Sequence, residues 1–120
     1  MAITLRNNKV AVVGLGAIGS PVAVNLAKKG VEVEVWNRSK EKCANAIAAG
    51  ATEVSELENI DAAIVLTALP DLTQVETLLE IGLNKALKSG DLLVVMGTVS
   101  PIAIKTLGKN LANRGIHLVD

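Results

Sequence analysis

The sequence predicts an α/β domain built on a doubly wound parallel sheet. Apolar runs of strand length alternate with segments of helical period, which is the pattern of parallel strands joined by crossover helices. The length of 120 residues fits one domain, and 50% of them are hydrophobic, which is ample for a core. The sequence contains no linker, repeat or low-complexity stretch that would divide it.

Six apolar runs are expected to be strands. They span residues 9–15, 31–37, 51–54, 61–67, 91–96 and 116–119. Crossovers between them favour a single sheet in the order 3-2-1-4-5-6, with helices on both faces. Glu34 fits poorly inside a strand that is covered on both faces, so we expect its side of the sheet to be partly exposed.

The segments between these runs carry helix signals. Expected helices span 17–29, 40–49, one turn after 55, a segment that opens at Asp71 or Thr73, and 101 to about 113. Ser39 and Ser55 are expected to cap the second and third of them, and Pro101 suits the first turn of the last. Glycine ends three helices, at Gly30, Gly50 and Gly115.

A glycine motif lies between the first expected strand and the first expected helix. It reads Gly14-Leu15-Gly16-Ala17-Ile18-Gly19, and this position is the context in which G-x-G-x-x-G indicates a Rossmann dinucleotide site. Gly14 would allow a tight turn, Gly16 would let a pyrophosphate approach the backbone, and Gly19 would let the helix pack closely on the strand. The free N–H groups of the helix would then face the phosphates. The alternative is a glycine-rich turn that holds no ligand.

The end of the second expected strand would choose between the two nicotinamide dinucleotides. NAD-binding domains place Asp or Glu there to bind the ribose 2′-hydroxyl, whereas this chain has Asn37 followed by Arg38. Without the carboxylate a 2′-phosphate is not repelled, and Arg38 can pair with it, helped by Ser39 and Lys42. These residues predict NADP(H) as the preferred cofactor, with NAD(H) as the alternative. In the other interpretation, Asn37 makes a turn, Ser39 caps a helix and Arg38 is solvated.

Five runs of the sequence resemble one family. They read VVGLGAIGSPVAVNLAKKG, VEVWNRSKEKC, AAGA, ALPDLTQVETLL and GTVSP. With them the chain resembles, over nearly its whole length, the N-terminal domain of the β-hydroxyacid dehydrogenase superfamily. That group includes 3-hydroxyisobutyrate, 6-phosphogluconate and tartronate semialdehyde dehydrogenases, glyoxylate/succinic semialdehyde reductases and imine reductases. The run VWNRS is most similar to the NADP-using glyoxylate reductase and imine reductase branches.

The resemblance implies further site residues. The family's loop after the fourth strand passes near the nicotinamide ribose, which assigns Ala68, Leu69 and Pro70 to the cofactor site. The family's Ser-Thr pair after the fifth strand corresponds here to Gly97-Thr98, so only Thr98 matches. Gly97 therefore departs from the family pattern on the hydroxyacid side of the substrate site.

The family's catalytic groups belong to a helical C-terminal domain that follows the sixth strand. That domain supplies a Lys in the hydroxyacid dehydrogenases and other acids in the imine reductases. We therefore expect residues 1–120 to form one dinucleotide-binding domain that lacks the substrate domain and is inactive alone. The expected function is the NADP(H)-binding part of an oxidoreductase that transfers hydride to or from a small hydroxyacid, semialdehyde or imine. The alternatives are an enzyme completed by another chain and a noncatalytic nucleotide-binding or interaction module.

The chain is expected to contribute no catalytic or metal-binding residue of its own. His117 is expected at the sheet edge, and Cys43 is expected to be a small packed residue because it has no CxxC partner. Asp61 and Asp91 begin strands after turns and are interpreted as solvated strand edges. No cluster of His, Cys or carboxylates has the spacing of metal ligands.

Composition limits the classes of partner. Lys+Arg and Asp+Glu number 12 each, so no overall electrostatic field attracts nucleic acid or an anionic membrane. The cytoplasm is the expected location. No apolar stretch reaches the roughly 18 residues needed to span a bilayer. A patch that includes Val94, Met96, Ile116 and Leu118 is expected to lie bare and to favour a homodimer. Trp36 is the only aromatic residue, which suggests a truncated, reconstructed or engineered sequence.

Overall fold

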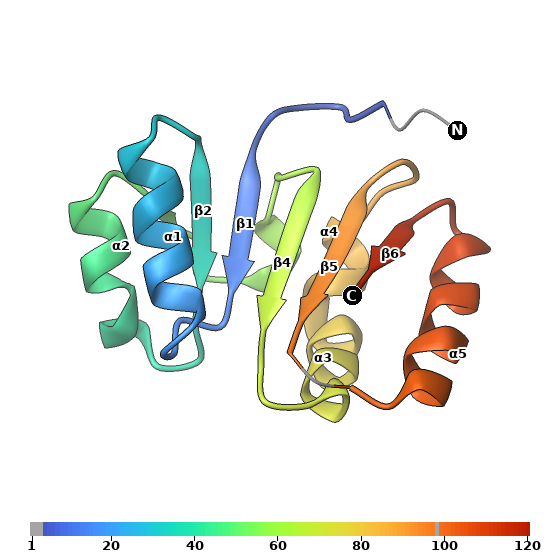
Figure 1. Cartoon of the computed structure of the whole chain (residues 1–120). Coiled ribbons are helices and arrows are strands. Elements are labelled where there is room, and N and C mark those ends of the chain that lie inside the picture. The colour runs from blue at the N-terminus through green and yellow to red at the C-terminus, as the bar shows by residue number, and fades with distance from the viewer. Residues whose placement is uncertain (1–3, 98) are drawn as a thin grey trace.

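Six parallel strands form one sheet in the computed structural model, which describes residues 4–97 and 99–120 (Figure 1). The strands are β1 (Val10–Val13), β2 (Val33–Trp36), β3 (Thr52–Glu53), β4 (Ile64–Ala68), β5 (Leu92–Met96) and β6 (His117–Val119). Their order is β3-β2-β1-β4-β5-β6, and every neighbouring pair is parallel. The predicted fold class and strand order are confirmed, although most strands are shorter than the apolar runs because the ends of the runs continue into loops.

Helical segments connect the strands. They are α1 (Gly19–Lys28), η1 (Lys40–Cys43) with α2 (Ala44–Ala48), η2 (Leu57–Asn59), α3 (Leu72–Leu78) with η3 (Leu79–Leu83) and α4 (Asn84–Ala86), and α5 (Pro101–Ala112). Asp71 caps α3, because its carboxylate accepts a hydrogen bond from the Gln74 N–H at 2.9 Å. Pro101 occupies the first turn of α5 as expected. In the described ranges no helix is long and apolar enough to cross a bilayer.

Of the two predicted serine caps, Ser39 holds the capping position and Ser55 does not, and neither makes a side-chain capping bond. Ser39 precedes η1, but its side chain makes no capping bond. Its carbonyl oxygen instead accepts from the Lys42 N–H at 3.2 Å, because the first turn is a 3-10 turn. Ser55 lies one residue too early, since Glu56 takes the capping position of η2 and no side chain caps that turn.

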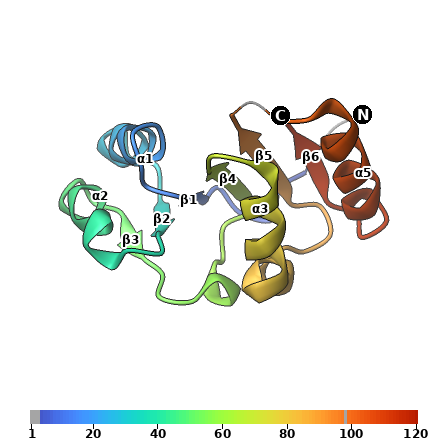
Figure 2. The same cartoon turned by 90° about the horizontal axis from the view of Figure 1, so that it is seen from below.

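Apolar side chains form two clusters, one on each face of the sheet. α1 and α2 pack over a cluster that includes Val12, Val35 and the buried Cys43. α3, α4 and α5 pack over a larger cluster that includes Val65 and Leu93. Figure 2 shows α1 and α3 on opposite sides of the strands. The predictions of helices on both faces and of a packed Cys43 are therefore confirmed.

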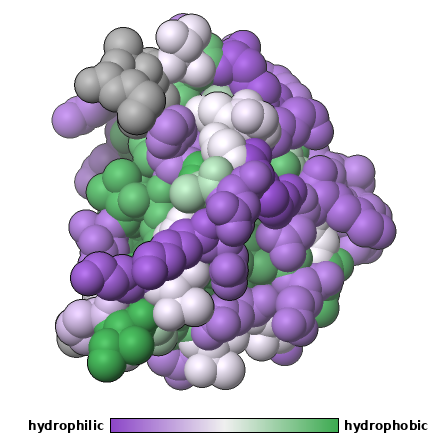
Figure 3. Space-filling model, turned by 90° about the vertical axis from the view of Figure 1, so that its right-hand side faces the viewer, coloured by the Kyte–Doolittle hydropathy of each residue, from purple (hydrophilic) through white to green (hydrophobic). Residues whose placement is uncertain are grey.

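The face that carries α1 is covered over only half of the sheet. In β4 and β5 buried residues alternate with half-exposed ones, whereas β1 buries three residues in a row. Leu66 belongs to the half-exposed set and touches the α1 cluster, which places the set on the α1 face. Hydrophobic atoms gather on the left of Figure 3, the side turned to the viewer in Figure 1. We call this set the open face, and it consists of Ile64, Leu66, Ala68, Leu92, Val94 and Met96.

Two of the four residues of the predicted bare patch are not on this face. The register pairs Leu93 with Leu118 and Val94 with Val119, so Leu118 points to the same side as the buried Leu93. Ile116 precedes β6 and is buried in the larger cluster. The prediction is therefore wrong for Ile116, which is buried, while Leu118 is half-exposed but lies on the opposite face because the two faces of a strand alternate.

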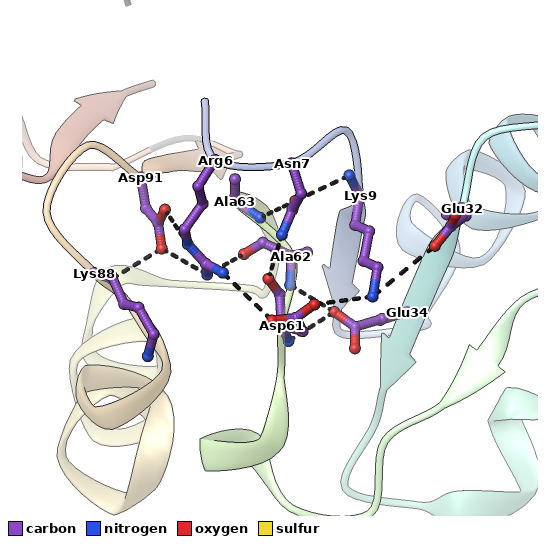
Figure 4. A network of polar contacts seen from close by, with 10 residues as sticks. All are labelled: Arg6, Asn7, Lys9, Glu32, Glu34, Asp61, Ala62, Ala63, Lys88 and Asp91. Carbon is purple, nitrogen blue, oxygen red and sulfur yellow. Dashed lines mark hydrogen bonds and ion pairs between the residues drawn. The ribbon is translucent and has the colours of Figure 1, made fainter. Parts of the chain in front are cut away.

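Charged side chains fasten the segment before β1 across the amino ends of the strands (Figure 4). The Arg6 guanidinium donates to both carboxylate oxygens of Asp91, at 2.9 and 3.1 Å, and the Lys88 N–H donates to the same carboxylate at 2.9 Å. The Lys9 ammonium donates to Asp61 at 2.9 Å. We call the following side chains the amino-edge network: Arg6, Asn7, Lys9, Glu34, Asp61 and Asp91.

The network corrects one prediction and explains another. Asp91 is 1% exposed, so its interpretation as a solvated strand edge is wrong; Arg6 neutralises it from 85 positions away in the chain. The Asp61 side chain is 55% exposed, as expected, although it is paired. Glu34 is half-exposed as predicted, and its carboxylate accepts from the N–H groups of Asp61 and Ala62 at 2.9 and 2.7 Å. These bonds explain why a charged residue fits inside β2.

Candidate functional site

A cavity opens at the carboxyl ends of β1, β2, β4 and β5, on the edge opposite to the amino-edge network. Its volume is about 560 Å³, which is the size of a small-molecule or cofactor site. The strand order reverses between β1 and β4, and doubly wound sheets bind ligands at that point. Eleven of the predicted site residues line the cavity, namely Gly14, Leu15, Gly16, Ala17, Ile18, Asn37, Arg38, Lys42, Ala68, Leu69 and Pro70.

Of the other three predicted site residues, two do not line the cavity and one is not described by the structure. Gly19 is the buried first residue of α1, beneath the glycine loop. Ser39 is exposed and does not line the cavity. Thr98 lies outside the described residues.

Several lining residues were not predicted. The cavity is also lined by Trp36, Gln74, Leu78, Met96 and Gly97. Met96 and Gly97 end β5 at the same edge as the glycine loop, so the general rule that ligands bind at carboxyl strand ends could have found them. Gln74 and Leu78 carried no sequence signal of this kind, because they reach the cavity only through the packing of α3 on the sheet.

The glycine loop is closely packed at its two ends and open in its middle. Gly14 has φ of +96°, and a Cβ built on it would lie 2.6 Å from the Ala68 carbonyl oxygen. A Cβ on Gly19 would collide with the Gly14 carbonyl oxygen, so α1 can start close to the loop only with glycine there. A Cβ on Gly16 would meet no atom within 4 Å, and Gly16 lines the cavity. The loop therefore leaves room for a group to approach its backbone at Gly16.

α1 begins directly after the part of the glycine loop that lines this space. Ile18 occupies the capping position without a side-chain capping bond, and the first turn carries no acidic residue. Such an uncapped helix end favours an anion through its unpaired N–H groups and its dipole.

The opposite end of the cavity is basic. Arg38 and Lys42 line it and are exposed, and within residues 4–97 and 99–120 neither side chain makes a hydrogen bond or ion pair. The Lys40 ammonium lies 4.9 Å from the centre of the Trp36 ring, within the range of a cation–π contact. Trp36 is only 9% exposed, so its ring is part of the cavity wall and little of it faces solvent.

Asn37 joins the two ends. Its Oδ1 accepts from the Leu15 N–H at 2.8 Å, and its Nδ2 donates to the Ser39 carbonyl oxygen at 2.9 Å. The side chain is therefore engaged with the backbone of both the glycine loop and the basic turn.

The charged groups in the part of the cavity wall that the structure describes are all basic. Arg38 and Lys42 are its only charged residues, and it includes no carboxylate, His or Cys. Burial raises the pKa of the Cys43 thiol, and this side chain is packed in the core. Among the described residues no three His, Cys, Asp or Glu side chains gather as a metal site. The arrangement can bind an anion, and among the described lining residues only Lys42 could also exchange a proton.

A family model described as the NAD-binding domain of 6-phosphogluconate dehydrogenase matches residues 9–120. The chain belongs to this family. The resemblance inferred from the sequence is thereby confirmed, and the glycine loop, the basic turn and the loop after β4 all fall within the matched residues of this NAD-binding domain.

The NAD-binding domain is similar to longer proteins. It is 36% identical over 119 residues to 2-(hydroxymethyl)glutarate dehydrogenase from Eubacterium barkeri, which covers 96% of this chain and 40% of that protein. It superposes on an imine reductase from Bacillus cereus with a TM-score of 0.79 and 28% identity, over 93% of this chain and 39% of that one. The structure of Psf3 in complex with NADP+ and 2-OPP gives a TM-score of 0.83 and 25% identity, over 91% and 40%. The chain thus spans about 40% of the length of these relatives.

Proposed function

We propose that this domain binds NADP(H) in the cavity and is the cofactor-binding part of an oxidoreductase. The observation that carries the proposal is a single cavity with an open glycine loop at one end and a basic turn at the other, where Asn37 replaces the usual carboxylate. The solved structure of Psf3 with NADP+ supports the choice of cofactor. When bound, the nicotinamide ring supplies or accepts a hydride.

The described residues would divide the dinucleotide between them. The backbone at Gly16 and the N-terminus of α1 would hold the pyrophosphate, because nothing fills the space over Gly16. Arg38 and Lys42 would hold the 2′-phosphate, Arg38 through its planar fork. The loop from Ala68 to Pro70 would border the nicotinamide ribose. A hydroxyl from Ser39 near the phosphate and a contact from Thr98 stay predictions from the sequence.

The proton-transfer half of the reaction needs groups beyond this cavity. Among the described lining residues only Lys42 could act as an acid or base, and we assign it to the 2′-phosphate rather than to the reacting carbon. We propose that the whole oxidoreductase acts on a small hydroxyacid, semialdehyde or imine, with its proton donor supplied by a further domain or by another chain. A noncatalytic nucleotide-binding module is the second candidate, because the same shortage of acid–base groups favours it.

The open face supports a proposal about association. Six apolar side chains on β4 and β5 are half-exposed side by side, which is typical of an interface rather than of a free surface. We propose that a second copy covers this face in the isolated chain and gives a homodimer. Analytical ultracentrifugation measures its dissociation.

The cytoplasm remains the proposed location, since Cys43 is the only cysteine and forms no internal disulfide.

A calorimetric titration of the 120-residue chain with NADPH, NADH and FAD tests the cofactor proposal. NADPH should bind more tightly than NADH, because only NADPH offers the 2′-phosphate to Arg38, and FAD should not bind. Equal affinities for NADPH and NADH would contradict the preference for NADP(H). Binding of neither would contradict the dinucleotide site itself.

A further inference from the structure

Asn37 occupies the junction between the glycine loop and the basic turn. In β1 and β2 the backbone ladder continues to the Gly14 N–H, which donates to the Trp36 carbonyl oxygen at 3.0 Å. At the next position the acceptor for the Leu15 N–H is the Asn37 side chain, at 2.8 Å, instead of a backbone carbonyl. The side-chain amide therefore ties the residue after the last backbone bond, in the loop that faces the cavity, to the end of β2.

The second half of the amide fixes the turn that carries Arg38. Nδ2 of Asn37 donates to the Ser39 carbonyl oxygen at 2.9 Å, and the same carbonyl accepts from the Lys42 N–H at 3.2 Å. The backbone on either side of Arg38 is thereby held, while the Arg38 side chain stays exposed at the cavity.

Chemistry determines which end of the amide faces which partner. The Leu15 N–H can only donate and the Ser39 carbonyl can only accept, so the carboxamide has one orientation that satisfies both. Aspartate could keep the bond from Leu15 but has no donor for Ser39. An apolar side chain could make neither bond.

We propose that Asn37 is a positioning residue that couples the pyrophosphate end of the site to the 2′-phosphate end. The inference rests on the proposed dinucleotide site, and it replaces a passive interpretation in which Asn37 matters only because it is not a carboxylate. In the passive interpretation any small neutral residue would serve equally well. If Asn37 couples the two ends of the site, loss of its amide disturbs the glycine loop and the basic turn together, so the affinities for NADPH and for NADH both fall.

The test compares Asn37→Ala and Asn37→Asp with the wild-type chain. Asn110→Ala, an exposed asparagine on α5, is the matched control. Asn37→Ala removes two hydrogen bonds, so its affinity for NADPH and for NADH should each fall about tenfold. Asn37→Asp keeps the acceptor for Leu15 and adds a charge near the 2′-phosphate, so it should lose NADPH and retain NADH. Circular dichroism melting confirms that each variant is folded.

Amide exchange in the cofactor-free protein supplies a readout that does not depend on binding. The Leu15 amide should exchange about tenfold faster in Asn37→Ala, stay protected in Asn37→Asp, and leave the Gly14 amide unchanged in both. If Asn37→Ala does not fold, Asn37→Ser takes its place, because its hydroxyl is too short to reach both partners. Wild-type affinity for NADPH together with wild-type Leu15 exchange in the alanine or serine variant would overturn the inference. Failure of the wild-type chain to bind either dinucleotide would overturn the proposed function instead.

Discussion

The amino and carboxyl edges of the sheet are made by the same strands but differ in which charged and hydrogen-bonding groups they leave without a partner. At the amino edge the Asp91 carboxylate receives three hydrogen bonds, two from Arg6 and one from the Lys88 N–H. At the carboxyl edge Gly16 faces open space and Arg38 has no partner among the described residues. A site for an anion must keep its donors available until the anion arrives, whereas a fastening site must satisfy them within the chain. The comparison assigns fold stabilisation to the amino edge and is consistent with the proposed cofactor site at the carboxyl edge.

The largest effect is expected from filling the space over the glycine loop. Gly16→Val should abolish binding of NADPH, since the branched side chain would occupy the place of the pyrophosphate. Its melting temperature should change little, because Gly16 has no φ in the left-handed region and no close neighbour. Calorimetric titration and thermal melting measure the two effects, with Ala44→Val on the exposed side of α2 as the control. A folded Gly16→Val chain that binds NADPH normally would place the site elsewhere.

The amino edge should show the reverse behaviour. Arg6→Ala leaves the buried Asp91 carboxylate without its ion-pair partner, and the free energy of unfolding should fall by about 3 kcal/mol. NADPH affinity of the folded protein should stay as in wild type, because the two edges lie at opposite ends of the strands. Urea denaturation and titration check the two outcomes, with exposed Lys105→Ala as the control. An unchanged stability would mean that Asp91 is satisfied without Arg6.

At the basic end of the cavity, a change in selectivity is expected without a change in stability. Arg38→Ala should remove most of the preference for NADPH over NADH, on the order of 1.5–3 kcal/mol for a charged hydrogen-bond partner. NADH affinity should hardly move, since NADH has no 2′-phosphate. Titrations of both cofactors against exposed Lys109→Ala measure this difference. Equal losses for the two cofactors would argue that Arg38 does not contact the 2′-phosphate.

A smaller effect concerns pH at the amino edge. The hydrogen bond from Lys9 lowers the pKa of Asp61, with help from Arg6. A carboxyl group whose pKa is lowered by folding stabilises the protein above its ordinary pKa near 4, and this contribution is lost as pH falls through the lowered value. Asp61→Asn should therefore weaken the dependence of stability on pH below about 5, measured by urea denaturation between pH 3 and 7. A variant with the same acid sensitivity as wild type would show that Asp61 contributes nothing to it.

The fold could be predicted because its signals are local. Apolar runs and glycine punctuation located the strands, and the crossover rules of doubly wound sheets then predicted their order. Asp71 was recognisable as the start of a helix from its place before α3. The wrong predictions concern residues whose burial or direction depends on partners that lie far away in the sequence. Asp91 looked solvated because nothing near it in the sequence reveals Arg6. The patch on β6 was assigned to the wrong face because register depends on pairing with β5, not on the sequence of β6 alone.

The candidate site likewise combines residues that can be recognised in the sequence with residues that only packing brings together. The glycine loop and the basic turn are each contiguous in sequence, and the structure brings both to one cavity. Gln74 joins them only through packing of α3 on the sheet, which no local pattern reveals, whereas Met96 could have been found from its place at the carboxyl end of β5. Asn37 was singled out for the charge it lacks, while the structure gives its amide two backbone partners that no motif records.

The most direct test of the difference between the edges is an amide chemical-shift map of the 120-residue chain titrated with NADPH. The largest changes should fall on residues 14–19 and 37–42, with smaller ones on the loop after β4. The amides of Asn7, Asp61 and Asp91 should stay in place, because the amino-edge network is already satisfied within the chain. Shifts concentrated at the amino edge would contradict the assignment of binding to the carboxyl edge.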